Sequence, residues 1–300
     1  MYGPSADVMG CEELVDTLVS YIEESFGVEY GAVPEVVHAS IADVESYVRD
    51  RDRAITGVEP DAATVHERAK HVYGSTSGIY DGINHRVLVM DNAARPQVLD
   101  DLGQGIEVDP TTMADQGELV YILAHELVHG YQRNHGAPSE PELIVASARS
   151  IQQENGSITG RLAGLFRANH MSEGMQLVYG ALPALTVIEG QADYMAMGAL
   201  LAHKDELPEA AAYAAQKYVE QTTDSGDGDY RTMVKGLLVA KQQMEAGKAP
   251  ELCTSPQFAH ALKDAQYIIG FDYIAETARD EGHSMDWFVE NLPDKLDAFL

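Results

Sequence analysis

Apolar residues recur at helical spacing along most of the chain. In residues 11–26 they fall at Leu14, Leu18 and Ile22, which places them on one face of a helix. The same period predicts further helices at Glu35–Arg49, Asp61–Tyr73, Glu118–Asn134, Glu142–Gln153, Ile158–Asn169, Ala184–Ala202, Pro208–Thr222, Arg231–Ala246, Pro256–Asp280 and Ser284–Asn291.

One stretch breaks this period. Ser77–Asp91, SGIYDGINHRVLVMD, places Asp81-Gly82 between two runs of β-prone residues. This pattern predicts a β-hairpin with Arg86–Met90 as its second strand. A loop rich in Gly, Asp and Pro follows at 100–112. A small sheet in the N-terminal third followed by helices indicates an α+β fold that is mainly helical.

The chain is strongly acidic. It has 48 Asp and Glu residues against 20 Lys and Arg, only eight of which are Lys, and a net charge of −28. Such a surface repels nucleic acid and anionic membranes, so we expect neither as a partner. The acidic residues are spread along the chain, which is typical of proteins from salt-loving microbes. An ordinary acidic protein from a low-salt host is the alternative.

The ends and the cysteines give no sign of export. Cys11 and Cys253 form neither a disulfide framework nor a CxxC pair. The N-terminus, MYGPSADVMG, lacks the basic start and apolar core of a secretory signal. No apolar run is long enough to cross a bilayer. We therefore expect a soluble, cytoplasmic protein.

The candidate chemistry lies in the helix predicted at Glu118–Asn134, with Gly136 as its stop. Its segment AHELVHGYQ places His125 and His129 one turn apart, so both imidazoles can bind one ion at the about 2.0–2.1 Å that zinc prefers. Glu126 is rotated by about 100° and can exchange a proton with metal-bound water. A core helix with two hydrogen-bonded histidines is the alternative. It is disfavoured because the helix is apolar nearly all round, and unpartnered buried His and Glu are costly.

A catalytic zinc site needs a third protein ligand. His135 follows His125 by ten residues, as in the longer motif HExxHxxGxxH, but Gln132 replaces the glycine at which the chain would leave the helix. Glu189 and Asp193 lie four residues apart in another apolar predicted helix. Glu189 can supply the third ligand, and Asp193 can accept the outer N–H of a metal-bound histidine.

The chain contains other acidic residues that could take the same role. Two acids on a solvated helix are the general alternative in so acidic a protein. Three further glutamates also follow the HExxH motif, but the residues four positions later, Ala146, Ile158 and Leu177, cannot hold a histidine. These glutamates are Glu142, Glu154 and Glu173.

HExxH followed by ExxxD resembles the gluzincins, the thermolysin-type zinc metallopeptidases. LAHELVHGYQRNH with IEGQAD is similar to bacterial and archaeal gluzincin-like proteins in which an EG-x-A helix carries the third ligand. GIYDGINHRVLVMD resembles the strand pair before their zinc helix, whose edge strand would pair with an extended peptide. Ala265–Asp294 is similar to a late helix pair with the pattern Y-x-x-G-x-x-F/Y.

This resemblance, which extends from about residue 77 to residue 294, implies a role for each matching residue. His125, His129 and Glu189 would bind one zinc per chain, Glu126 would be the general base, and Asp193 would orient a histidine. It also implies a donor that stabilises the oxyanion. Tyr267 fits the late-helix pattern better than His260 or Tyr273, with core packing as the alternative.

The sequence therefore predicts a zinc-dependent peptidase that acts on peptide or protein substrates. We expect an N-terminal helical segment at 1–73 and a zincin-like catalytic domain at 74–300, or else one continuous domain over 1–300. A catalytically silent, zinc-stabilised binding module is the alternative function. It is disfavoured because a structural site has no need of Glu126. A zinc hydrolase of non-peptide amides is a third hypothesis.

Overall fold

The computed structural model describes residues 11–90, 116–155, 171–207, 216, 230–245 and 256–300. The loop predicted at 100–112 and the helix predicted at Ile158–Asn169 lie outside these residues, as does all of Pro208–Thr222 except Gln216. No helix in the described ranges combines the length and the apolar character that a membrane crossing requires.

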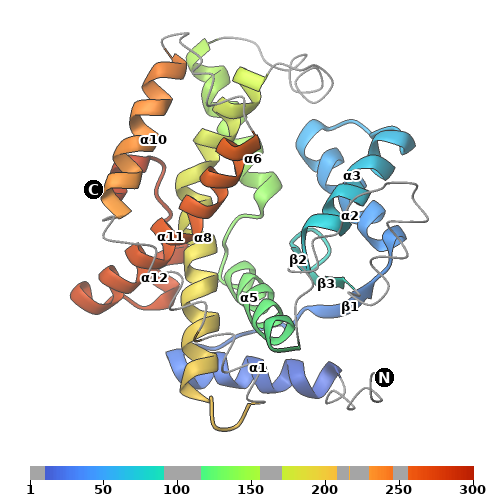
Figure 1. Ribbon diagram of the computed structural model, residues 1–300, viewed down its shortest axis with the longest axis vertical. Helices are drawn as coiled ribbons and strands as arrows, with labels where there is room; N and C mark the ends of the chain where they lie inside the picture. Colours follow the sequence, from blue (N-terminus) through green and yellow to red (C-terminus); the bar gives the residue numbers. More distant parts are fainter. Residues whose placement is uncertain (1–10, 91–115, 156–170, 208–215, 217–229, 246–255) are drawn as a thin grey trace. The chain divides into compact units, whose positions relative to one another are not determined.

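The described chain is mainly helical, with one small sheet (Figure 1), which confirms the predicted α+β class. Most predicted helices are present, with ends that differ by a few residues, although α8 begins thirteen residues earlier than expected. The elements in order are α1 (Cys11–Phe26), β1 (Glu35–Ala39), α2 (Ile41–Thr56), α3 (Ala62–Ser75), β2 (Gly78–Asp81), β3 (Arg86–Met90), α5 (Gln116–Asn134), α6 (Glu140–Asn155), α8 (Met171–Ala202), α10 (Tyr230–Glu245), α11 (Pro256–Glu281), α12 (Met285–Glu290) and the 3-10 helix η3 (Leu296–Phe299).

The helix predicted at Glu35–Arg49 is wrong in its first third. Glu35–Ala39 forms β1, which pairs in parallel with β3, and the helix α2 begins only at Ile41. Ser40 and Asp43 mark the change, because the backbone N–H and the hydroxyl of Ser40 both donate to Oδ2 of Asp43, at 2.8 and 2.6 Å. This reciprocal cap starts the helix and leaves the β-branched Val36 and Val37 to the sheet.

The predicted hairpin is confirmed as β2 and β3. They pair antiparallel, and Asp81 opposite Arg86 closes the ladder. The fully buried Asp81 accepts from Nε of Arg86 at 2.8 Å and from the N–H groups of Ile83 and Asn84, so one carboxylate orders the whole turn. The last turn residue, His85, has a φ of 51°.

The sheet has the order β1-β3-β2, so β2 lies at one edge in the described part of the chain. Successive strand residues point to opposite faces, and helices contact both. Figure 1 shows α2 and α3 on one side of the strands, and α5 contacts β2 and β3. The core between the sheet and the helices α2 and α3 comprises Ala39, Val44, Val48, Val65, Ala69, Tyr73, Leu88 and Met90.

The chain divides into two compact units. The first comprises Met1–Val48, Asp61–Asn134 and Met195–Glu220, and the second comprises Arg49–Pro60, His135–Tyr194 and Gln221–Leu300. The sheet, α1, α3 and α5 belong to the first unit, whereas α6, α10, α11 and α12 belong to the second. The domain boundary predicted between residues 73 and 74 stays a prediction.

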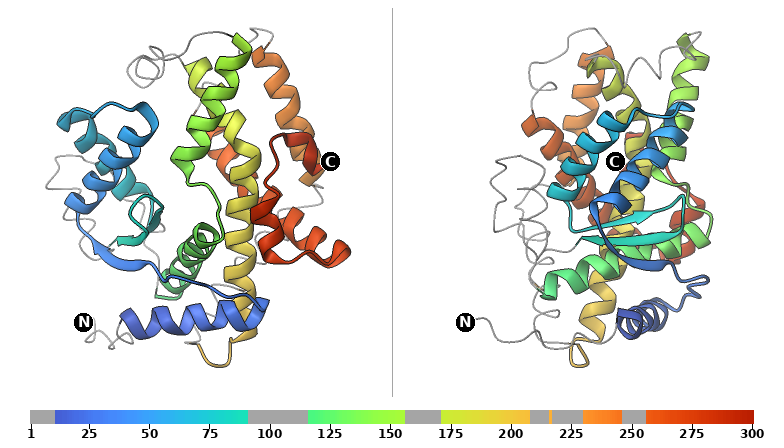
Figure 2. Two further views of the ribbon diagram at one scale, coloured as in Figure 1. Left: turned by 180° about the vertical axis from the view of Figure 1, so that it is seen from behind. Right: turned by 90° about the vertical axis from the view of Figure 1, so that its right-hand side faces the viewer.

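The second unit is held together by helix crossings and aromatic contacts. α10 lies beside α11 (Figure 2), where Arg231 donates to both carboxylate oxygens of Glu276, at 2.8 and 2.9 Å. Tyr273 of α11 meets the rings of Phe288 and Phe299 edge-on, with centroids 6.3 and 4.9 Å away. The half-buried Tyr273 therefore packs against the rings of Phe288 and Phe299.

Candidate metal-binding site

The helix α5 is buried along most of its length, as its apolar sequence predicts. Leu127 and Val128 are fully buried between the two histidines, and His125 itself is only 7% exposed. Gly136, with a φ of +93°, follows the last helical residue, Asn134, in the conformation that ends helices. Burial of this helix means that its polar side chains need partners inside the protein.

His125 and His129 face each other from consecutive turns of α5. Their Nε2 atoms lie 3.1 Å apart, and the two rings are nearly perpendicular, at 85°. Two nitrogens that bind one tetrahedral zinc at 2.0–2.1 Å lie about 3.3 Å apart, so the observed spacing fits a shared ion. The predicted convergence of these two rings is confirmed.

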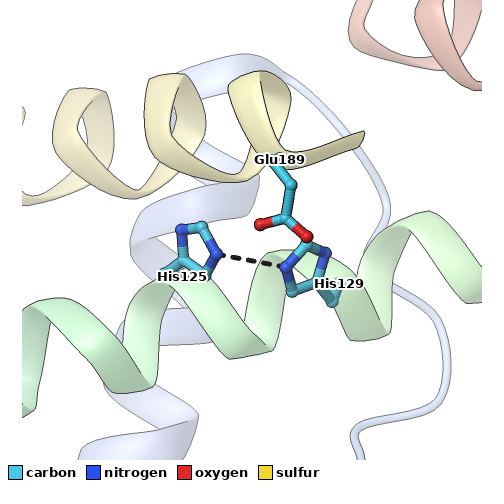
Figure 3. A group of neighbouring side chains, drawn as sticks. All are labelled: His125, His129 and Glu189. Atoms are coloured by element: carbon cyan, nitrogen blue, oxygen red, sulfur yellow. Dashed lines mark hydrogen bonds between the residues drawn. The ribbon is translucent and has the colours of Figure 1, made fainter. Parts of the chain in front are cut away.

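Glu189 of α8 completes the group. One ligand atom each from His125, His129 and Glu189 lies within 4.8 Å of the others. Figure 3 shows the carboxylate directed from α8 toward the two rings on α5. Two imidazole nitrogens and one carboxylate oxygen are a donor set that suits a divalent transition metal. These three residues could therefore bind a metal ion, as the sequence analysis predicted.

The position of Glu189 is set by a close helix crossing. A Cβ atom added to Gly190 would lie 2.0 Å from the carbonyl carbon of Gly270, and one added to Gly270 would lie 2.0 Å from the carbonyl oxygen of Thr186. The backbones of α8 and α11 therefore touch beside Glu189. The two glycines belong to the EG-x-A and Y-x-x-G patterns of the sequence, and this crossing is the physical reason for both.

A second contact holds the same turn of α8. Gln191 is 1% exposed, and its Nε2 donates to the carbonyl oxygen of Met285 at 2.7 Å. Met285 is the first residue of α12. The turn that carries Glu189 is thus fixed to α11 by backbone packing and to α12 by a buried hydrogen bond.

Gln132, which stands where the longer motif HExxHxxGxxH has a glycine, contacts the candidate site directly. Its Oε1 lies 2.8 Å from Nδ1 of His129, and its side chain is 1% exposed. A spacing of three residues on a helix could have indicated this contact, because such side chains lie one above the other.

Tyr80 of β2 is a second neighbour of His129 that the sequence analysis missed. The two rings lie 6.3 Å apart with an angle of 29° between their planes. The phenol donates to Nδ1 of His85 at 2.7 Å, and Nε2 of His85 donates to the carbonyl of Ala32 at 3.1 Å. Burial raises the pKa of Tyr80 to about 12, so the ring beside His129 is neutral at physiological pH.

Glu126 lies against the edge strand. A Cβ added to Gly78 of β2 would lie 3.2 Å from Cγ of Glu126, 3.5 Å from its Oε1 and only 2.5 Å from Cγ2 of Ile122. Any larger residue at Gly78 would push β2 away from α5 or displace the glutamate. The bare backbone of the strand therefore leaves room for the half-buried Glu126 side chain.

His135 and Glu142, two alternative third ligands, have other contacts. Nε2 of His135 lies 3.7 Å from a carboxylate oxygen of Asp286. Glu142 accepts hydrogen bonds from the N–H and the hydroxyl of Ser139, at 2.7 and 2.9 Å, and so caps α6. Neither residue belongs to the metal-ligand group found among the described residues. The side chains of Glu154 and Glu173 lie outside the described part of the structure.

The roles of Asp193 and Tyr267 stay predictions. Asp193 lies one turn after Glu189 in α8 and is 5% exposed. Tyr267 lies one turn before Gly270 in α11 and is partly buried. The side chain of His260 lies outside the description.

Comparisons with protein-family models, with curated proteins and with solved structures find no match for this chain. The resemblance to gluzincins therefore depends on the motifs alone. What the structure adds is the convergence of the two histidines and the glutamate from separate helices.

Proposed function

We propose that the protein is a zinc-dependent hydrolase of peptide bonds. The observation that carries this proposal is the grouping of one ligand atom each from His125, His129 and Glu189 within 4.8 Å, with Glu126 next to His125 in the same helix. Three protein ligands leave one position of a tetrahedral ion for water or substrate, as catalytic zinc sites require. Glu126 distinguishes this arrangement from a structural zinc site, which has no need of a general base.

Each side chain has a definite task in this proposal. Zinc, when bound, polarises the scissile carbonyl and lowers the pKa of a coordinated water. Glu126 accepts a proton from the water as its oxygen attacks the carbonyl carbon. The same carboxyl group then delivers that proton to the amine nitrogen as the C–N bond breaks. Tyr267 is the proposed donor to the oxyanion, and Asp193 is proposed to orient a histidine.

An extended peptide is the substrate that the sheet suits best. The strand β2 lies at the edge of the sheet in the described residues and contacts α5. The main chain of a peptide can add to such an edge as a further strand, which would bring its carbonyl groups toward Glu126.

Metal analysis tests the ligand set. We expect one zinc per chain in the purified protein, measured by elemental analysis. Glu189→Ala should lose it, since removal of one of three ligands leaves the ion weakly held. His135→Ala is the matched control and should keep its zinc. A Glu189→Ala protein that retains zinc, together with a His135→Ala protein that loses it, would contradict the proposed class.

Glu126→Gln tests catalysis separately from binding. Cleavage of a peptide library should fall by at least about 10²-fold, because the amide cannot accept the proton, whereas zinc content and folding should be unchanged. Glu290→Gln, at an exposed position of α12, is the control and should cleave normally. A wild-type protein that binds zinc but cleaves nothing at high salt would instead favour the binding module.

A further inference from the structure

We propose that Gln132 is a positioning residue that fixes the tautomer and the ring orientation of His129 for metal binding. The inference rests on the proposed metal site and assigns to it a fourth residue. The contact that carries it joins Oε1 of Gln132 to Nδ1 of His129, at 2.8 Å.

The orientation of the amide determines which nitrogen of the imidazole carries the proton. A glutamine Oε1 can only accept a hydrogen bond, so Nδ1 of His129 carries the proton in this pairing. The neutral ring then has its lone pair at Nε2. This is the nitrogen that faces Nε2 of His125 at 3.1 Å, within the group that could hold the ion.

Burial makes this arrangement specific. Gln132 is 1% exposed, and the alternative tautomer would place Nδ1 without a proton opposite the amide oxygen. Two acceptors would then face each other where water has little access, which costs free energy. The other tautomer, with a proton at Nε2, cannot bind metal through Nε2, the nitrogen that faces His125.

The ring of His129 is confined on a further side. Tyr80 lies beside it, with ring centroids 6.3 Å apart. One face of α5 carries both rings and the amide that orients the ring of His129. This is because the intervals from His125 to His129 and from His129 to Gln132 are four and three residues.

The experiment compares two substitutions of nearly equal size. Gln132→Met removes the acceptor and keeps the volume, whereas Gln132→Glu keeps an acceptor oxygen at the same place. We expect Gln132→Met to weaken zinc binding by about 10–100-fold, the usual effect of losing a partner of a metal-bound histidine. Gln132→Glu should bind zinc at least as tightly as the wild type, because a carboxylate accepts the same proton. Gln242→Met, at an exposed position of α10, is the control.

A second readout does not depend on metal. Nitrogen-15 NMR of the metal-free protein at about pH 8.5, where most histidines are neutral, reports which ring nitrogen carries the proton. We expect the proton of His129 on Nδ1 in the wild type and in Gln132→Glu, and a shift toward Nε2 in Gln132→Met. A purely structural glutamine would change the melting temperature and leave the tautomer unchanged.

The outcomes separate this inference from the proposed function. A wild-type protein that binds no zinc contradicts the peptidase, while the NMR result still decides the role of Gln132. Equal zinc affinities for wild type and Gln132→Met, or a proton on Nε2 of His129 in the wild type, would overturn the role of Gln132 and leave the three-ligand site intact.

Discussion

Tyr30 joins the segment before β1 to the middle of the HExxH motif. Its phenol donates to the backbone carbonyl of Leu127, and its side chain is 1% exposed. Its ring also lies 6.4 Å from that of Tyr131, and a Cβ on Gly130 would come within 2.6 Å of its hydroxyl oxygen. One buried phenol thus fixes the backbone of α5 between the two histidines.

Tyr30→Phe should lower the free energy of unfolding by about 1 kcal/mol at neutral pH, because the variant loses one buried hydrogen bond. Burial also raises the pKa of Tyr30 above that of an exposed tyrosine, about 10. The stability that this group confers is complete below pH 10 and is lost as the pH rises further, since only the unfolded chain then ionises it.

The difference in stability between wild type and Tyr30→Phe should therefore narrow above pH 10. Chemical denaturation of both proteins at several pH values measures it. A difference that stays constant up to pH 11 would show that the phenol of Tyr30 does not titrate as its burial requires.

At the scale of residues, the sequence predicted the candidate metal ligands better than the groups around them. His125, His129 and Glu189 could be recognised because HExxH and ExxxD have fixed helical spacing. Gln132 has equally regular spacing, but its role depends on the orientation of one ring. Tyr80 comes from a strand, and only the docking of β2 on α5 brings it to His129.

At the scale of elements, the crossing of α8 and α11 determines where Glu189 lies. Gly190 and Gly270 let the two backbones touch. A methyl group on Gly190 would overlap the backbone of Gly270 in α11, and one on Gly270 would overlap the carbonyl oxygen of Thr186 in α8. Backbone atoms cannot turn aside as a side chain can. The crossing thus depends on glycine at both positions.

Gly190→Ala should lower the free energy of unfolding by about 2–3 kcal/mol, since overpacking forces the helices apart. It should also weaken zinc binding, because the adjacent Glu189 moves with the backbone. Gly236→Ala is the matched control, as Gly236 is exposed in α10 and a Cβ there meets nothing within 4 Å. That variant should gain up to about 1 kcal/mol from better helix propensity.

Chemical denaturation of both glycine variants measures the free energy of unfolding, and zinc titration measures their affinity for the metal. Equal stabilities of Gly190→Ala and Gly236→Ala would contradict the close crossing.

Helices could be predicted from the sequence where residues typical of helix ends mark their bounds. α3 begins within one residue of the predicted start at Asp61, which caps it, and α5 ends before Gly136, the predicted stop. β1 was missed because its partner β3 lies about fifty residues later, and a pairing across that distance leaves no periodic mark. The Ser40–Asp43 cap was the local signal that could have separated the strand from the helix.

At the scale of the whole molecule, charge is the dominant feature. A net charge of −28 on 300 residues produces self-repulsion that opposes the compact state. Many of the acids lie on exposed positions, among them Glu13, Glu29 and Glu290. The buried Asp81 differs from them, because it forms an ion pair with Arg86 within the hairpin. The repulsion therefore acts mainly at the surface, where dissolved salt can screen it.

Salt should accordingly stabilise the protein. Raising KCl from about 0.1 M to about 1 M shortens the screening length from about 10 Å to about 3 Å, so repulsion between neighbouring carboxylates weakens. We expect the melting temperature to rise over this range, measured by circular dichroism in a chloride salt. The triple variant Glu13→Gln, Glu29→Gln and Glu290→Gln removes three surface charges and should show a shallower rise. A melting temperature that falls with KCl would mean that attractive ion pairs such as Arg231–Glu276 outweigh the surface repulsion. An equal slope for both proteins would mean that these three surface charges do not contribute to it.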